Sequence, residues 1–262
     1  LRRDYAGLYV RCCQFASVLD RAGLGPGDTV SVMLLNTPAM IEAHYGVPMA
    51  GAVLHSLNTR LDAATIAFQL DHAEAKIVIT DVALLPRMRE ALGMAEGTPR
   101  LIVYDDAEYD GPKSAYDETE YEAFIADGDA NFPWKMPASE WDAISINYTS
   151  GTTGDPKGVV YHHRGAYLLA QGNALTASMK KQAIYLWTLP MFHCNGWCFP
   201  WTISALSGTH VCLRDVRADN IWKAILEHRV SHMCGAPIVM SMVVSGKPEN
   251  AKLDYEVEFF TA

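Results

Sequence analysis

The densest group of residues able to hold phosphate lies between Tyr148 and Gly158, in the run Tyr-Thr-Ser-Gly-Thr-Thr-Gly-Asp-Pro-Lys-Gly. Its glycines let backbone N–H groups close on an anion, its hydroxyls donate hydrogen bonds, and Lys157 adds a point charge. A Walker loop requires Gly-Lys-Ser/Thr, whereas here Pro156 precedes the lysine and Gly158 follows it. A plain surface turn is the alternative, but such turns rarely place Lys after Gly-x-Pro at the end of a strand. The run therefore predicts a phosphate loop of another kind.

The elements that must position this loop follow from the apolar pattern. Short apolar stretches predict strands at 29–35, 52–55, 76–80, 101–104, 143–149, 184–189, 210–213, 231–235 and 257–260, with helices near 8–19, 38–50, 63–72, 82–92, 162–178 and 219–229. Asp62 is expected to cap the helix that follows it, and Asn36-Thr37-Pro38 to supply a cap and a first-turn proline for helix 38–50. This alternation predicts an α/β fold with mainly parallel sheets covered by helices. Ligands gather at the carboxyl ends of strands in such folds, where the phosphate run is expected.

A second group of chemically suitable residues follows the expected strand 184–189, in Leu189-Pro-Met-Phe-His193-Cys-Asn-Gly-Trp197. Aromatic and small residues around a single histidine suit a pocket for an apolar acid whose carboxylate faces a polar group. A histidine packed in the core is the alternative interpretation. A third segment, Gly235-Ala-Pro-Ile-Val239, is weaker evidence for a pocket, because Gly-Ala-Pro is also an ordinary strand-to-helix turn.

The run 148–158 resembles the phosphate loop of the acyl-adenylate-forming, or AMP-binding, superfamily, which includes acyl- and aryl-CoA ligases, luciferases and the adenylation domains of peptide synthetases. It matches every position of the pattern [Tyr/Ser/Thr]-[Ser/Thr]-Ser-Gly-Thr-Thr-Gly-x-Pro-Lys-Gly. The segment around His193 resembles the acid–CoA ligase motif Pro-[Met/Leu]-[Phe/Tyr]-His-x-x-Gly, 235–239 resembles a wall of the acyl tunnel, and 43–60 resembles the N-terminal part of the family. Within the superfamily the chain looks most similar to medium-chain, aromatic or methylmercaptopropionate–CoA ligases.

The resemblance implies an ATP-dependent ligase that activates a small carboxylic acid as acyl adenylate and transfers the acyl group to coenzyme A. His193 would be catalytic, gating the path between carboxylate and thiol, and Gly151, Gly154 and Gly158 would act as hinges of a loop that orders on ATP binding. The ATP contacts would come from Thr149, Ser150, Gly151, Thr152, Thr153, Gly154 and Lys157. The acid would be bound by His193, Asn195, Gly196, Trp197, Gly235, Ala236 and Pro237.

The family also uses a glutamate for Mg²⁺, an aspartate for the ribose hydroxyls and a lysine on a mobile C-terminal domain, and residues 1–262 contain none of those motifs. We therefore expect the chain to be an incomplete N-terminal AMP-binding domain. Its C-terminal part and its Mg²⁺ ligand would be absent, and it would be inactive alone. Both ends look cut. Two other interpretations remain open: an adenylation domain that loads a carrier protein, and a non-catalytic nucleotide-binding remnant.

Composition narrows the function classes further. Ten acidic residues and one lysine fall in 105–129, so this segment accounts for the whole net charge of −9, and no basic stripe for nucleic acid remains. The turn-rich stretch 105–139 is the best candidate for an internal break. Six cysteines form no Cys-x-x-Cys pair, and His193, Cys194 and Cys198 fit no usual zinc spacing. Because neither a membrane span nor a signal peptide is evident, we expect a cytoplasmic protein, compatible with a homo-oligomer.

Overall fold

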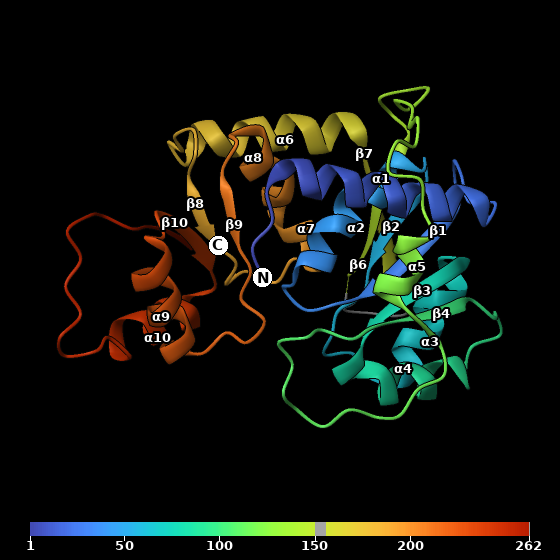
Figure 1. The fold of residues 1–262 in the computed structure, drawn as a ribbon, viewed down its shortest axis with the longest axis horizontal. Coiled ribbons are helices and arrows are strands. Elements are labelled where there is room, and N and C mark those ends of the chain that lie inside the picture. Colours follow the sequence, from blue (N-terminus) through green and yellow to red (C-terminus); the bar gives the residue numbers. More distant parts are fainter. Residues whose placement is uncertain (150–155, 262) are drawn as a thin grey trace. The chain divides into compact units, whose positions relative to one another are not determined.

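The computed structural model describes residues 1–149 and 156–261, and the chain forms two compact units (Figure 1). Unit 1 comprises Leu1–Leu34 and Ala39–Arg164, and unit 2 comprises Leu35–Pro38 and Gly165–Ala262. The stretch 105–139, where an internal break is expected, lies inside unit 1. Ion pairs tie it there: Arg89 donates to Glu118 across 2.7 Å.

Unit 1 is built on a seven-stranded sheet in the order β5-β4-β3-β1-β2-β6-β7. Every neighbouring pair is parallel except β6 and β7, which form an antiparallel hairpin at one edge. The strands are β1 (Thr29–Met33), β2 (Val53–Ser56), β3 (Ala75–Asp81), β4 (Arg100–Tyr104), β5 (Thr119–Glu120), β6 (Ala143–Thr149) and β7 (Lys157–His162). The central strands β1 and β2 are buried along their whole length because both faces of the sheet are covered.

Helices α1 (Tyr5–Arg21) and α2 (Pro38–Met49) lie on the opposite side of this sheet from α3 (Ala63–His72) and α4 (Leu85–Leu92), which follows the 3-10 turn η1 (Val82–Leu84) (Figure 1). The α3–α4 side is an aliphatic core containing Met33, Ile66 and Val78.

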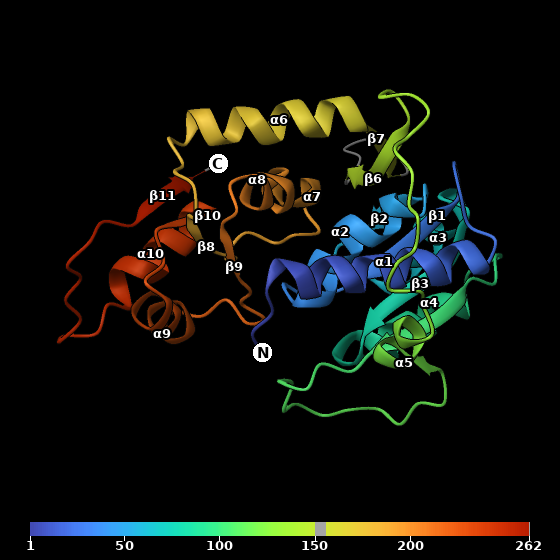
Figure 2. The ribbon, with the colours of Figure 1, turned by 45° about the horizontal axis from the view of Figure 1, so that its top comes forward.

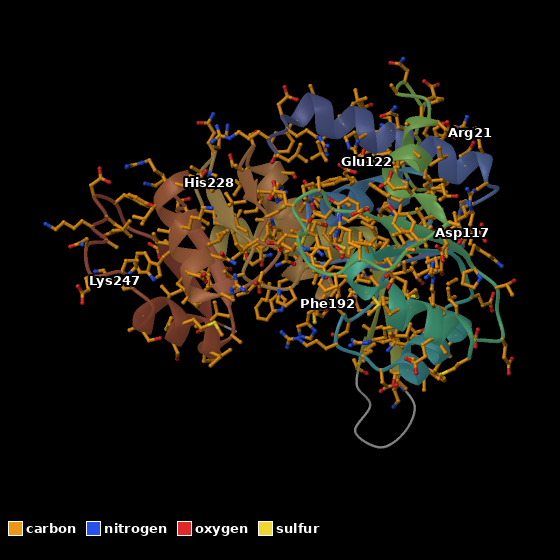
Figure 3. The ribbon with its side chains drawn as sticks, turned by 60° about the horizontal axis from the view of Figure 1, so that its bottom comes forward. Arg21, Asp117, Glu122, Phe192, His228 and Lys247 are labelled. Carbon is orange, nitrogen blue, oxygen red and sulfur yellow. The ribbon has the colours of Figure 1, made fainter. Side chains whose placement is uncertain are left out.

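On the other side a buried carboxylate joins three helices. Glu42 of α2 accepts hydrogen bonds from Arg11 of α1 (Nε–Oε1 2.7 Å) and from Tyr121 of α5 (Tyr121–Ala126; Oη–Oε2 2.8 Å). Arg11 also pairs with Glu122, labelled in Figure 3, at 2.7 Å. A buried charge of this kind is stable only while every partner is present.

Unit 2 contains a parallel four-stranded sheet in the order β11-β10-β8-β9. Its strands are β8 (Ile184–Leu186), β9 (Thr209–Val211), β10 (His232–Gly235) and β11 (Glu258–Thr261). Its helices are α6 (His163–Thr176), which begins at the unit boundary, and α7 (Cys194–Trp197), α8 (Phe199–Ala205), α9 (Ala218–His228) and α10 (Pro237–Ser245).

Helices cover both faces of the unit 2 sheet, as Figure 2 shows. Along β8, Leu186 belongs to the core formed with Ile221 and Ile225 of α9, whereas the ring of Tyr185 stacks on Phe199 of α8 at 5.0 Å. Successive side chains of a strand point to opposite faces, so α8 and α9 lie on opposite sides of the sheet.

The predicted fold class is confirmed, and most element boundaries agree within a few residues. Asp62 caps α3 by accepting the Thr65 N–H at 2.8 Å, and Pro38 is the first residue of α2. Of the residues expected to cap α2, Asn36 uses its side-chain amide to bond a distant segment of unit 2 instead. Strand β7 was not predicted. No helix within 1–149 and 156–261 is long and apolar enough to cross a bilayer.

Candidate functional site

The structure describes the two ends of the predicted phosphate loop in unit 1, and we call these two ends its root. Strand β6 ends at Thr149 and β7 begins at Lys157, and these two residues face each other in the antiparallel register. Because β6 runs parallel to β2, Thr149 lies at the carboxyl end of a parallel strand, with its side chain and that of Lys157 exposed. Ser150, Gly151, Thr152, Thr153 and Gly154 lie outside the described residues.

Hydrogen bonds and a ring contact among four side chains hold Tyr148, which precedes Thr149 at the root of the loop. The hydroxyl of Tyr148 is hydrogen-bonded to Nδ1 of His72 at 2.7 Å, and the Tyr148 ring lies 5.0 Å from the ring of His55. Nδ1 of His55 in turn bonds Oγ of Ser31 at 2.8 Å. Burial raises the pKa of Tyr148 to about 12 and lowers the pKa of His55 to about 4, so both are uncharged at neutral pH. Sequence reasoning missed this set, since no local pattern joins residues from four elements.

Gly158 has a packing reason to be glycine. A Cβ built there would lie 2.7 Å from Cδ1 of Ile146, across the hairpin on β6, which is closer than real Cβ atoms come to a neighbour. A larger residue at this position, the first pair after Lys157, would therefore require the end of the Ile146 side chain to move. The hinge role of Gly158 stays a prediction.

In unit 2 the segment after His193 forms a left-handed turn. The φ angles of Cys194, Asn195, Gly196, Trp197 and Cys198 are 47°, 43°, 52°, 56° and 61°. This conformation costs roughly 1–2 kcal/mol for each residue that is not glycine, so the surrounding packing must hold it. Asn195 and Gly196 are buried within the turn. His193, which follows Phe192 (labelled in Figure 3), is exposed, and Trp197 is 39% exposed.

The turn packs on a buried tryptophan. A Cβ at Gly196 would lie 2.9 Å from Cζ3 of Trp187, which is fully buried, so the backbone approaches the indole as only glycine allows. Trp187 is itself fixed, because its Nε1 donates to Nδ1 of His210 at 3.1 Å. No sequence signal pointed to Trp187 or His210.

The third predicted segment lies beside the second. Gly235 ends β10, Ala236 precedes α10 and Pro237 is its first helical residue; Gly235 is buried and the other two are exposed. Strands β8 and β10 are parallel neighbours, and Oγ1 of Thr188 donates to the carbonyl of Cys234 at 2.7 Å. The residues after β8 and those after β10 therefore leave the same edge of the unit 2 sheet. The alternative of His193 as a core residue is wrong, because its side chain is exposed.

Metal-binding side chains do not gather in the described ranges. Residues 1–149 and 156–261 hold no group of three or more His, Cys, Asp or Glu arranged for a metal ion. Nε2 of His193 lies 3.9 Å from Sγ of Cys194, while burial raises the pKa of Cys198 to about 12 and keeps it a thiol. We therefore assign no Mg²⁺ ligand to a described residue.

Comparison with known proteins defines the class. The model of the AMP-binding enzyme family matches residues 2–259, so the chain belongs to that family. It is 46% identical to the peroxisomal acetate/butyrate–CoA ligase of Arabidopsis thaliana, over 97% of this chain and 47% of that protein. It is also 46% identical to the peroxisomal benzoate–CoA ligase of the same plant, over 91% of this chain and 42% of that protein. The relatives place it in the acid–CoA ligase branch. The chain spans about half the length of these curated relatives.

Solved structures agree with the fold. The N-terminal domain of FACL13 from Mycobacterium tuberculosis matches with a TM-score of 0.81 and 25% identity, over 100% of this chain and 63% of that one. A fatty acyl CoA synthetase from the same organism matches with a TM-score of 0.82 and 25% identity, over 100% of this chain and 49% of that one. Both support the prediction that the described units correspond to part of such an N-terminal domain.

Proposed function

We propose that the full-length gene product carrying this sequence is an ATP-dependent acid–CoA ligase acting on a small carboxylic acid. The observation that carries the proposal is the phosphate-loop sequence set between β6 and β7, at the carboxyl end of a parallel strand, in a chain of the AMP-binding enzyme family. The names of the relatives favour coenzyme A over a carrier protein as acceptor. Their acids, acetate, butyrate and benzoate, indicate a short-chain or aromatic substrate.

The reaction would begin with attack of the carboxylate oxygen on the α-phosphorus of ATP. A new O–P bond forms, the bond to the bridging oxygen breaks, and pyrophosphate leaves with that electron pair. Two anions must approach each other, so cationic and N–H donors around the phosphates lower the barrier. The exposed ammonium of Lys157 and the hydroxyl of Thr149, paired at the root of the loop, are the described groups in place for that task.

The second step transfers the acyl group. The thiolate sulfur attacks the carbonyl carbon of the acyl adenylate, the C–S bond forms, and AMP leaves with the electrons of the C–O bond. In our proposal His193 and Trp197 line the acid side, Asn195 and Gly196 shape the turn between them, and Gly235, Ala236 and Pro237 form a neighbouring wall. This division is supported by their common edge of the unit 2 sheet and by the exposure of the His193 and Trp197 side chains.

Mg²⁺ would supply charge neutralisation at the ATP phosphates. The described residues offer no cluster of His, Cys, Asp or Glu that fits the ion. The expected cytoplasmic location stays a proposal, and fluorescence microscopy of a tagged full-length protein would test it.

Pyrophosphate exchange tests the proposed function directly. Purified full-length gene product should incorporate labelled pyrophosphate into ATP only when a matching acid is present, in a panel running from acetate and butyrate to benzoate and medium-chain acids. Adding coenzyme A should then yield the acyl-CoA, detected by mass spectrometry. Exchange without acyl-CoA, but with acylation of a carrier protein, would select the adenylation-domain alternative. Folded protein that supports no exchange with any acid would favour the non-catalytic remnant.

A further inference from the structure

Asn36 makes three hydrogen bonds to a backbone segment some 150 residues further along the chain. Its Nδ2 donates to the carbonyl oxygens of Trp187 (2.8 Å) and Leu189 (3.0 Å), and its Oδ1 accepts the N–H of Met191 (2.9 Å). Asn36 is only 7% exposed, and all of these residues belong to unit 2. The pattern uses both donors and the acceptor of one planar amide. An aspartate would lack the donors.

These bonds matter because strand β8 ends early. Residue pairing with β10 and β9 stops at Leu186, and the N–H of Trp187 makes the last bond to β9, to the carbonyl of Val211 at 2.9 Å. The other polar backbone groups up to Met191 depend on partners outside this ladder, and buried backbone groups rarely go without one. The side chain of Asn36 supplies three of these partners. The N–H of His193 then donates a hydrogen bond to the carbonyl of Pro190 at 3.2 Å. The side chain of Asn36 therefore fixes the backbone segment that leads into His193.

A second asparagine holds the far end of the same segment. Nδ2 of Asn173, on α6, donates to the carbonyl oxygen of Trp197 at 2.7 Å and lies 3.3 Å from Oγ1 of Thr202. Oγ1 of Thr202 in turn bonds the carbonyl of Cys198 at 3.0 Å. Cys198 ends the left-handed turn and is the N-cap of α8, so its carbonyl also accepts the Thr202 N–H at 3.0 Å. The carbonyl of Trp197, one residue earlier, is held by Asn173.

We propose that Asn36 and Asn173 are positioning residues for the acid side of the site, Asn36 through His193 and Asn173 through Trp197. Neither needs to touch the reacting atoms. Asn36 fixes the segment that enters the turn, Asn173 fixes the residue that leaves it, and the exposed imidazole and indole lie between these two anchors. The consequence for the acid rests on the proposed function, whereas the placement of the two side chains does not.

The test compares three variants with the same chemical change in the full-length gene product: Asn36→Asp, Asn173→Asp and Asn220→Asp. Asn220 is the matched control, because its Nδ2 also donates to a carbonyl, that of Asp215 at 3.1 Å, but at the exposed start of α9. Each substitution replaces a donor by a carboxylate oxygen that faces a carbonyl. Thermal unfolding identifies the variants that fold. If Asn36→Asp does not, Asn36→Ser, which keeps one donor, takes its place.

Two kinds of readout are expected to separate the two positions. Asn36→Asp should raise KM for the acid by about tenfold or more and KM for ATP by less than about twofold, in line with the loss of two buried hydrogen bonds. It should also shift the ring resonance of ¹³C-labelled His193. Asn173→Asp should change the ratio of kcat/KM between a small and a bulky acid by at least about threefold, and it should move the ¹⁹F resonance of fluorinated Trp197. Asn220→Asp should do neither.

Folded Asn36 and Asn173 variants that match Asn220→Asp in acid KM, acid preference and both resonances would overturn the proposal. A merely structural role would lower the unfolding temperature and leave the acid KM of the folded enzyme unchanged, which also contradicts it. If the wild-type protein activates no acid, the proposed function fails. The two resonances then still decide whether Asn36 positions His193 and Asn173 positions Trp197.

Discussion

The two candidate regions are positioned by different means. In unit 1 the phosphate-loop root is held by a β-hairpin, in which main-chain pairing from Ala143 to Thr149 sets the register of Lys157. In unit 2 the His193 segment has no such ladder, and its left-handed turn rests on Trp187 and on side-chain amides from α6 and the Leu35–Pro38 strip. The main-chain hydrogen bonds of a ladder can form whatever the side chains are, whereas the hydrogen bonds that hold the turn come from particular asparagine side chains. The loop root should therefore tolerate nearby substitutions that the turn does not.

Gly196→Ala should produce the largest effect, because it disrupts the packing that holds the left-handed turn in unit 2. The new Cβ would meet Trp187 at 2.9 Å, at a φ of +52°. Overpacking plus the left-handed strain should reduce the free energy of unfolding by about 2–4 kcal/mol. Gly172→Ala is the control, because nothing lies within 4 Å of its Cβ position in α6. Urea unfolding of both variants checks the difference, and equal stabilities would mean that the turn is not held as described.

Lys157→Ala should come next, acting on chemistry and not on stability. Loss of one charge-assisted phosphate contact should weaken adenylation by about 1.5–3 kcal/mol, or roughly ten- to a hundredfold, at low ATP. The exposed position of Lys157 predicts an unfolding temperature near that of the wild type. Pyrophosphate exchange as a function of ATP measures the first effect. Exchange within twofold of the wild type at low ATP would remove Lys157 from the phosphate set.

Mild acid should weaken unit 1 through its buried histidines. Burial lowers the pKa of His44 to about 4, below its ordinary 6.5, and Nδ1 of His44 donates to the carbonyl of Met40 at 2.7 Å. Between these values the unfolded chain binds the proton and the folded chain does not, so stability is present at pH 7 and falls as the pH drops towards 4. The loss from this one histidine should be about 2 kcal/mol at pH 5.

The pH effect is checked by urea unfolding of the wild type and of His44→Asn, whose amide can still donate to Met40 but does not titrate. His44→Asn should lose less stability than the wild type between pH 7 and pH 5. His55, whose pKa burial also lowers to about 4, should contribute the remaining dependence in both proteins. Identical pH profiles for the two proteins would contradict the assignment of a neutral His44.

Trp197→Ala should give the smallest effect, and it tests whether the turn in unit 2 sets the preference among acids. Removing a 39% exposed indole from the acid side should shift preference towards bulkier acids by about three- to tenfold in relative kcat/KM. The ATP dependence of adenylation should hardly change, because no phosphate contact is lost. Equal loss of activity for all acids, with the protein still folded, would mean that Trp197 supports the core.

The difference in positioning also explains which features of the structure could be predicted from the sequence. The β6 strand, the Asp62 cap and the alternation of strands and helices carry local signals, and all three are confirmed. The turn at 194–198 carries only a partial one, since Asn195 and Gly196 favour left-handed backbone but Cys-Asn-Gly-Trp-Cys has no recognised preference for five consecutive left-handed residues. Strand β7 was not predicted because none of its residues is buried and exposed and half-buried positions do not alternate along it. The hydrogen bonds of Asn36 carry no local signal either, because its partners lie about 150 residues away.

The membership of Leu35–Pro38 in unit 2 has a consequence for how this protein is made. During synthesis this strip leaves the ribosome long before β8, so the segment after β8 must wait for a long loop to close before Asn36 can reach it. Unit 2 is consequently discontinuous in the gene. A fragment beginning at Gly165 would leave the carbonyls of Trp187 and Leu189 without their amide donor. Recombination at Arg164 would therefore separate the turn from its anchor, and the two units cannot be exchanged as independent modules.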